Sequence, residues 1–304
     1  MSSFWSNWIT VITLGNILAC VWLIWWTMRK RDGESAEGDV TGHAWDGDLQ
    51  EYNNPLPRWW LWMFYITIIF GFGYLYLYPG LGNYGGALGW TAQNQHEAEI
   101  AAADEKYGPI YAQYRDVSVE ELAKNSDANA MGKRLYLTYC MQCHGSDARG
   151  SKGYPNLADN DWLWGGSPDM IEVSIAQGRR QKAPMPAAQA MPPWTQIIGE
   201  DGVAQVTEYV LELSGRKADA EMAAKGKDIY MTNCSACHMP DGAGFHALGA
   251  PRLNDNIWLF GKSKSQIKDV IANGRNQVMP GWKEMLGDDK VHVLTAYVYS
   301  LSNN

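Results

Sequence analysis

Cysteines are few in this sequence, and basic residues are outnumbered by acidic ones. The chain has 304 residues but only 5 cysteines. Four of them form two pairs of equal spacing, so no disulfide framework is implied. Lys and Arg number 25 against 33 Asp and Glu, for a formal net charge of −8. This balance favours a basic partner, or is simply a means of solubility, and it argues against nucleic-acid binding.

Charged residues are also missing from the stretch Phe4 to Met28, which is rich in Ile, Leu, Val and Trp. At ~1.5 Å per residue, a helix of this length crosses a hydrocarbon core of ~30 Å. A cleavable signal peptide fits poorly, because no basic segment precedes the run and the run is too long. Cys20 lies inside it and is expected to act as a small apolar residue. We expect a retained transmembrane helix over about residues 4–28.

A second apolar run, Trp59 to Tyr78, has aromatic residues at both ends. Basic residues 29–31 follow the first run and Arg58 precedes the second, so the positive-inside rule places residues 29–58 in the cytoplasm. This connection shows neither helical nor strand periodicity and is predicted to be a loop. Residues 1–80 are therefore predicted to form a transmembrane helical hairpin in lipid, in a bacterial inner membrane. The N-terminus and everything after Pro79 would be periplasmic.

Residues 81–125 are expected to connect the membrane segment to the rest of the chain. Residues 84–88 are rich in glycine and predict a flexible exit from the membrane. Residues 93–114 contain Ala, Glu and Lys in helical proportions and predict a surface helix.

Two C-x-x-C-H pentapeptides, at residues 140–144 and 234–238, are the attachment signature of a c-type haem. Two thiols on one helical turn can add to the two vinyl groups of a porphyrin, and the histidine then faces the iron. A redox dithiol or a four-cysteine zinc site would explain neither histidine. We therefore predict two covalently bound haem c groups, held by Cys140, Cys143, Cys234 and Cys237, with His144 and His238 as axial ligands.

The two motifs lie in matching surroundings, which indicates an internal duplication. A helical stretch precedes each motif, a G-x-P-x-L-like element and an N-x-W-L-like element follow, and an Ile-Ala-x-Gly-Arg segment comes later. Each copy closes with an apolar helix, at about residues 202–214 and 288–301. Residues 126–216 and 217–304 are predicted to be two copies of one small domain.

Methionine is the expected sixth ligand of each iron, since a thioether favours ferrous iron and raises the potential. Met279 is the candidate in the second copy. The first copy offers Met185 and Met191, and we favour Met191 because it shares a Met-Pro-x-Trp ending with Met279. Sequence order leaves open whether each methionine serves its own copy or the two cross. An iron with histidine and methionine as its two axial ligands carries electrons and leaves no open position for oxygen or peroxide.

The arrangement resembles class I cytochrome c, which implies an all-α fold: the membrane hairpin followed by two tandem cytochrome c domains. In that family the proline of G-x-P-x-L accepts a hydrogen bond from the proximal histidine. Carried over, Pro155 would orient His144 and Pro251 would orient His238. Arg179, Arg180 and Arg275 either bind haem propionates or form solvated surface. The nearby tryptophans are expected to form the haem walls.

A further pattern, T-G-H-A-W-D-G at residues 41–47 and N-N-P-L-P-R-W-W at 53–60, precedes the second apolar run. With the two haem motifs, it resembles the dihaem subunit III (CcoP or FixP type) of cbb3-type cytochrome c oxidases, over essentially the whole chain. The resemblance implies a non-catalytic, electron-entry subunit of a proton-pumping oxidase. It would pass electrons from a donor cytochrome c to a monohaem subunit and a haem–copper catalytic subunit. His43 is expected to have a structural role.

The sequence also leaves other functions open. A free-standing, membrane-anchored dihaem carrier similar to cytochrome c4 would have no need of the pattern at 43–60. A dihaem peroxidase would need one open or labile iron position, against which two Met-Pro-x-Trp elements argue. Assembly or gas sensing by the haems stands as a secondary role.

Overall fold

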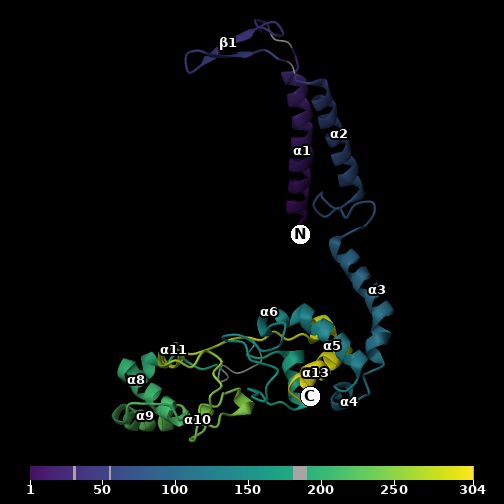
Figure 1. The fold of residues 1–304 in the computed structure, drawn as a ribbon. Coiled ribbons are helices and arrows are strands. Elements are labelled where there is room, and N and C mark those ends of the chain that lie inside the picture. The colour runs from purple at the N-terminus through teal and green to yellow at the C-terminus, as the bar shows by residue number, and fades with distance from the viewer. Residues whose placement is uncertain (30–31, 55, 181–189, 304) are drawn as a thin grey trace. The chain divides into compact units, whose positions relative to one another are not determined.

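The computed structural model describes residues 1–29, 32–54, 56–180 and 190–303. The chain divides into two compact units, residues 1–105 and 106–304 (Figure 1). Lys30, Arg31, Pro55 and the candidate ligand Met185 lie outside the described residues.

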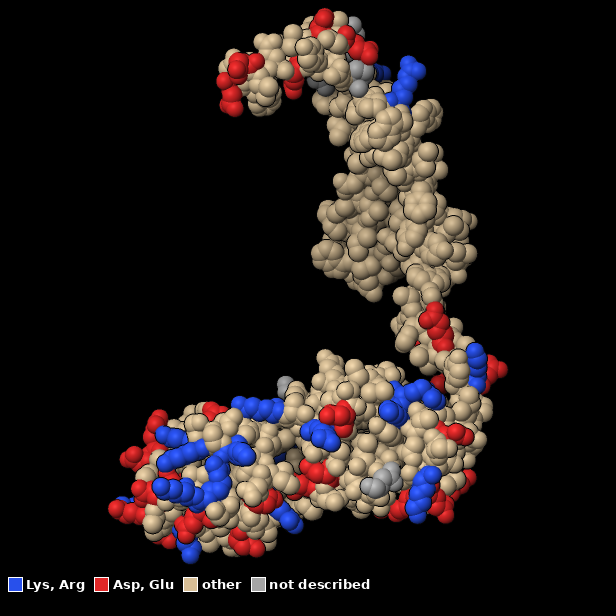
Figure 2. All heavy atoms as spheres, in the orientation of Figure 1, with Lys and Arg blue, Asp and Glu red and all other residues tan. Residues whose placement is uncertain are grey.

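Two long apolar helices dominate the first unit, α1 (Ser3–Thr27) and α2 (Arg58–Leu77). Both are long and apolar enough to cross a membrane by length and composition, and neither has a buried residue. Figure 2 shows an uncharged surface along them, with acidic and basic side chains beyond. Asn83 follows α2, and its backbone N–H donates to Ser6 Oγ near the start of α1 at 2.8 Å. The two helices therefore run in opposite directions, side by side (Figure 1).

The connection between α1 and α2 corrects two expectations, because it contains a β-hairpin where a loop in an all-α fold was predicted. Strands β1 (Val40–Trp45) and β2 (Leu49–Tyr52) pair antiparallel. Every residue of both strands is exposed, so burial imposes no alternating pattern that periodicity could detect. The turn did carry a signal: Asp46 and Gly47 both have positive φ, a backbone that an Asp-Gly pair favours in hairpins.

After the hairpin and α2, helix α3 (Ala92–Ala112) covers nearly the whole of the helix expected at residues 93–114. The elements of the second unit that follow it are α4 (Val119–Leu122), α5 (Ser126–Tyr139), α6 (Met141–His144), α7 (Pro168–Gln177), α8 (Thr195–Leu213), α9 (Ala220–Asn233), α10 (Ser235–His238), the 3₁₀ turn η2 (His246–Leu248), α11 (Lys264–Asn273), α12 (Lys283–Leu286) and α13 (Asp288–Asn303).

The helices that lead into the cysteines begin in the same way in both copies. Asn125 Oδ1 accepts hydrogen bonds from the first free N–H groups of α5, and Asp219 Oδ1 does the same for α9. Such caps stabilise a helix start by about 1 kcal/mol. The duplicated sequence is therefore matched by duplicated local structure.

Two of the three hydrophobic cores described in this unit exchange their closing helices. One core joins α5 and α7 to α13, through buried residues such as Tyr136, Ile171 and Leu294. The other joins α9 and α11 to α8, through residues such as Tyr230 and Val206. A division of the chain at residues 216 and 217 therefore does not separate the two cores. The connection between α8 and α9, residues 214–219, is short, and short connections make consecutive helices antiparallel neighbours.

A glycine permits close contact in each exchanged helix pair. A Cβ on Gly132 of α5 would lie 2.5 Å from Tyr297 Cβ of α13, and a Cβ on Gly226 of α9 would lie close to Gln205 of α8. Beside them, Tyr136 packs against Tyr297 with ring centroids 5.5 Å apart, and Tyr209 against Tyr230 at 5.1 Å. Each of the two interfaces therefore combines a glycine contact with a tyrosine pair.

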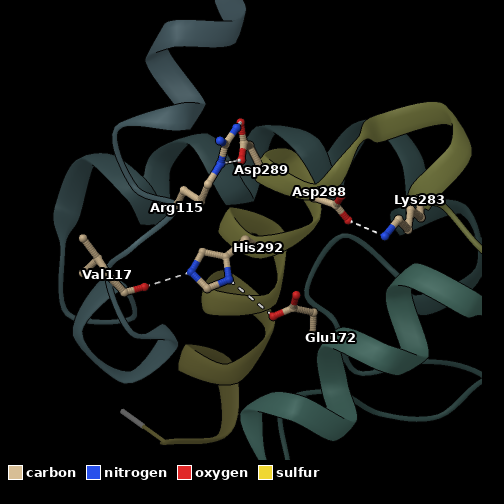
Figure 3. Close-up of polar contacts among 7 residues, drawn as sticks. All are labelled: Arg115, Val117, Glu172, Lys283, Asp288, Asp289 and His292. Atoms are coloured by element: carbon tan, nitrogen blue, oxygen red, sulfur yellow. Dashed lines mark hydrogen bonds and ion pairs between the residues drawn. The ribbon is translucent and has the colours of Figure 1, made fainter.

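Polar contacts hold α13 against the segments that surround it (Figure 3). Arg115 donates to both carboxylate oxygens of Asp289, from Nε at 2.7 Å and Nη2 at 2.8 Å. The His292 ring lies between the Val117 carbonyl, 2.8 Å from Nε2, and the Glu172 carboxylate, 3.3 Å from Nδ1. These contacts bind the last helix to the segment after α3 and to α7.

Candidate functional site

The first C-x-x-C-H motif lies where α5 ends and the single turn α6 begins. Cys140 and Cys143 line a cavity together with His144. His144 Nδ1 is 3.0 Å from the Pro155 carbonyl. Because a carbonyl can only accept, Nδ1 carries the proton and Nε2 keeps its lone pair. Burial lowers the pKa of His144, which keeps the ring neutral, as a metal ligand must be.

The second motif repeats this geometry between α9 and α10. His238 Nδ1 is 3.0 Å from the Pro251 carbonyl, and burial lowers the pKa of His238 as well. Cys234 and Cys237 line a second cavity with His238. Both histidine–proline contacts are the ones that the resemblance to class I cytochrome c implied.

The two cavities lie next to each other. Their volumes, open to solvent, are about 1290 Å³ around His144 and about 1240 Å³ around His238. Within the described part of the chain, three residues line both cavities: Leu163, Arg180 and Leu259.

The two candidate methionines that the structure describes each line the cavity of the other copy. Met279 lies in the cavity of His144, and Met191 in the cavity of His238. Paired backbone hydrogen bonds fix both segments. Met279 pairs with Arg179, at 2.9 and 3.0 Å, and Met191 pairs with Arg275, at 2.9 and 2.8 Å.

Glycine is needed where these methionine segments meet the ends of α7 and α11. A Cβ on Gly274 would lie 2.3 Å from the Met191 carbonyl oxygen, and a Cβ on Gly281 would lie 2.8 Å from the Gln177 carbonyl carbon. The backbones approach so closely that a side chain at either place would displace a methionine segment.

The cysteines do not fit the alternative chemistries. Burial raises the pKa of Cys140 and of Cys234 to about 11, whereas a redox dithiol needs a thiol of low pKa. The two pairs line different cavities, so they do not converge on one tetrahedral zinc site. Throughout the described ranges, His, Cys, Asp and Glu side chains form no cluster of three or more suited to a metal ion.

The residues present do fit a haem. The cavity walls are largely aromatic and aliphatic, and they include Trp162 and Trp282 on the His144 side and Trp194 and Trp258 on the other. Trp258 Nε1 and Arg180 Nε are buried donors without a hydrogen-bond partner in the described structure. Propionate carboxylates would satisfy such donors.

The three arginines considered from sequence all donate to protein groups, and of these three Arg180 alone has a buried nitrogen without a partner in the described structure. Arg179 donates from Nε and Nη2 to Ser174 Oγ, at 2.9 and 2.7 Å. Arg275 is paired with Asp269 and donates to the Gly274 carbonyl at 2.6 Å. Arg180 donates from Nη2 to the Gly249 carbonyl at 3.2 Å, which leaves its Nε unpartnered.

Two tyrosines also belong to the site and were not singled out from sequence. Tyr136 donates its hydroxyl proton to the Gly145 carbonyl at 2.7 Å, and Tyr230 donates to the Met239 carbonyl at 2.8 Å. Both rings are fully buried and line the cavities. Burial raises both tyrosine pKa values, so the hydroxyls remain donors that fix the backbone after each histidine. The two tyrosines occupy the same position in the two copies, and this repetition could have identified them from sequence.

His43 lies far from either cavity in sequence and is part of β1 in the other unit. Its ring packs edge-on against Trp45, with centroids 4.4 Å apart. Its backbone N–H is 3.4 Å from Thr41 Oγ1. These contacts are those of a structural residue in a hairpin.

Comparison with known proteins gives a consistent result over the whole chain. The family model described as the N-terminal domain of cytochrome oxidase-cbb3, FixP, matches residues 37–85. The model described as cytochrome c oxidase, cbb3-type, subunit III, matches residues 127–210 and 221–298.

Curated relatives agree with these matches. A cbb3-type cytochrome c oxidase subunit CcoP from Rubrivivax gelatinosus is 44% identical over 99% of this chain and 96% of its own length. Subunit CcoP from Cereibacter sphaeroides is 37% identical over 90% and 98%, and subunit FixP from Azorhizobium caulinodans is 40% identical over 86% and 92%.

Proposed function

Because this chain belongs to the subunit III family of cbb3-type cytochrome c oxidases, we propose that it is the electron-entry subunit of its oxidase. Membership makes it a membrane-anchored, haem c-binding cytochrome subunit of that oxidase. The role within the complex is the proposal, and it rests on the two cavities.

The chain is proposed to hold two haem c groups through Cys140 and Cys143 and through Cys234 and Cys237. His144 and Met279 would hold one iron, and His238 and Met191 the other. The cavity linings support this crossed assignment, because each methionine faces the histidine of the other copy. The contacts with Pro155 and Pro251 hold both rings with Nδ1 protonated, so Nε2 would be free to bind an iron.

The observation that carries the function is the adjacency of the two cavities, which share Leu163, Arg180 and Leu259. When bound, haem c supplies reversible one-electron transfer. The residues of this chain would fill both axial positions of each iron, surround the sites with aromatic walls and set the distance between the centres. Two adjacent sites without an open axial position would suit a relay and would leave no position for oxygen or peroxide.

The anchor is proposed to be a hairpin of two spans, α1 and α2, with the N-terminus and the haem region in the periplasm. Three observations support it: both helices are apolar and unburied, they run antiparallel, and Arg29 and Arg58 lie at the shared end with the β-hairpin. Positive residues favour the cytoplasmic side. The paired haem cavities would then face a periplasmic donor.

The proposed partners follow from this placement. A donor cytochrome c would deliver electrons, and a monohaem cytochrome subunit would receive them and pass them to the haem–copper subunit that reduces oxygen. The exposed aromatic residues of α2, such as Trp59 and Trp62, offer contact surface to neighbouring subunits or lipid within the membrane.

Purification through a tag on this chain in mild detergent tests the proposal, followed by a reduced-minus-oxidised spectrum and oxygen uptake with a reduced cytochrome c. We expect b-type haem bands and oxygen uptake to copurify. A stable lone chain with c-type bands only would overturn the proposal in favour of a free carrier. A chain with Met191 and Met279 both replaced by Ala is the control, and it should keep its covalent haems but lose the methionine-ligated spectrum.

A further inference from the structure

Arg180 is the charged residue that the two cavities have in common. Of the three described residues that line both, Leu163 and Leu259 are apolar. Arg180 comes three residues after the end of α7, and its φ of 57° lies in the left-handed region, which is unusual for a residue with a side chain. Such a conformation persists where surrounding contacts hold it, and it is often found at functional sites.

The guanidinium of Arg180 is held, yet it retains donor capacity. Nη2 donates to the Gly249 carbonyl at 3.2 Å, and the guanidinium carbon lies 5.9 Å from the centre of the Trp164 ring. Nε is buried and has no partner within the described structure. Ion pairs among the described residues involve Arg115, Arg149 and Arg275, and none involves Arg180.

Arg179 and Arg275 differ from Arg180 in the number of cavities that they line and in the partners of their donor groups. Arg179 lines the cavity of His144 alone, and Arg275 lines the cavity of His238 alone. Their donors are engaged with Ser174 and with Asp269. Arg180 is therefore the described arginine that faces both cavities and still has an unsatisfied buried donor.

We propose that Arg180 is a shared counter-charge for the two haem sites, which raises the reduction potential of both. The inference rests on the proposed occupation of both cavities by haem. Reduction adds one electron to each centre and lowers its charge by one, with no proton or leaving group involved. A fixed positive charge favours that added electron, and the low dielectric of a buried site strengthens the effect. Arginine is suited to the place because it stays protonated even when buried.

The same residue gives the two sites a common electrostatic control. One cation between two centres stabilises the first added electron and also offsets part of the repulsion felt by the second. Both reduction steps are therefore raised together, while the difference between the two potentials is left as it was. A relay benefits, because neither centre is favoured over the other and the electron is not trapped at one of them.

Redox titration of the purified, full-length chain in its complex tests the proposal, with the c-type absorbance fitted to two one-electron steps. For Arg180→Gln we expect both steps to fall, each by up to about tenfold in the reduction equilibrium, or about 59 mV for a one-electron couple. Arg275→Gln should lower one step only, because Arg275 lines a single cavity. Arg134→Gln, an exposed arginine on α5, should leave both unchanged.

Arg180→Lys separates charge from packing, and it is expected to keep both potentials near those of the original chain. The proposal is overturned if Arg180→Gln moves neither step or only one, or if Arg180→Lys falls as far as Arg180→Gln. Failure of the underlying function is a different outcome, since the unaltered chain would then lack two covalent c-type haems or fail to copurify with the oxidase.

Discussion

The two halves of the second unit, each with one C-x-x-C-H motif, are built from the same parts, yet they are assembled differently. The His238 half pairs α8 with α9, which are consecutive in the chain. The His144 half pairs α5 with α13, which lie at opposite ends of this unit in sequence. Bringing distant segments together costs more loop-closure entropy than pairing neighbours. A duplicated sequence can therefore give two halves that differ in how far apart in the chain their paired helices lie.

The contacts around the closing helices fit this difference. Helix α13 is held by Arg115 at Asp289 and by the His292 contacts to Val117 and Glu172. Helix α8 carries the buried Glu208, which accepts from the backbone N–H of Asp219 in the short connection and pairs with Lys264. The long-range half is fastened by the segment before α4 and by α7, whereas the local half is fastened by the short α8–α9 connection and by α11.

The largest expected effect comes from a chain that ends at Gly287 and so lacks α13. This helix supplies Leu294, which is fully buried and worth about 2–5 kcal/mol on its own, and Val298, which lines the cavity. We expect the His144 half to lose its tertiary structure and the His238 half to keep it. Limited proteolysis with mass spectrometry should show cleavage in α5 and α7 and protection of α8 and α9. Cleavage in α9 with protection of α5 would contradict the exchange.

A smaller effect is expected from a methyl group placed at the exchanged helix contacts. Gly132→Ala should destabilise the pairing of α5 with α13 by about 1–3 kcal/mol, because its Cβ meets Tyr297 and the Val293 carbonyl. Hydrogen exchange read by mass spectrometry should then rise in α5 and α13. Gly226→Ala should raise it in α8 and α9 instead.

Gly108→Ala is the control for these two variants. A Cβ there meets nothing within 4 Å, and alanine is the better helix former by about 0.5–1 kcal/mol. We expect no added exchange in either haem half. If Gly132→Ala raised exchange in α5 and α8 while α13 stayed protected, each closing helix would belong to its own copy.

The smallest effect concerns the ion pair that fastens α13. The hydrogen bond from Arg115 lowers the pKa of Asp289 from its ordinary value. A lowered folded-state pKa contributes stability above the unfolded value of about 3.9, and this stability is lost as the pH falls through the folded value. Asp289→Asn should therefore lower the thermal midpoint by about 1 °C at neutral pH, and by nothing in strong acid.

Asp228→Asn serves as the matched control, since Asp228 is exposed and forms no ion pair among the described residues. Calorimetry across pH compares the two variants. A difference for Asp289→Asn that persisted below the lowered pKa would show that packing, not charge, holds the helix there.

Sequence predicted the elements of this protein better than their pairing. The residue types and spacing of Cys140 to His144 sufficed to predict a haem-attachment helix, and the proline after each motif could be placed by resemblance. The partner of α8 could not be predicted in this way, because a pattern of apolar residues does not say whether a closing helix packs against α5 or against α9. The short connection at residues 214–219 was the physical clue, since it favours local pairing.

Other features could not be predicted from the sequence either. The hairpin at Val40 to Tyr52 is exposed on both faces, so hydrophobic alternation gave no signal and only Asp46-Gly47 marked the turn. The three arginines near the haem cavities were indistinguishable in sequence, because their hydrogen-bond partners depend on the folded chain. Met185 lies outside the described residues, and the choice of Met191 over it stays a prediction.

The most direct measurement of the exchange uses a chain that keeps only the first haem-attachment motif, with Cys234 and Cys237 replaced by Ala. Into it we would introduce Met279→Ala or Met191→Ala, and record the methionine-to-iron charge-transfer band of the oxidised protein. The exchange predicts that Met279→Ala abolishes the band and that Met191→Ala leaves it intact. A band that survives Met279→Ala and is lost with Met191→Ala would show that each methionine serves its own copy.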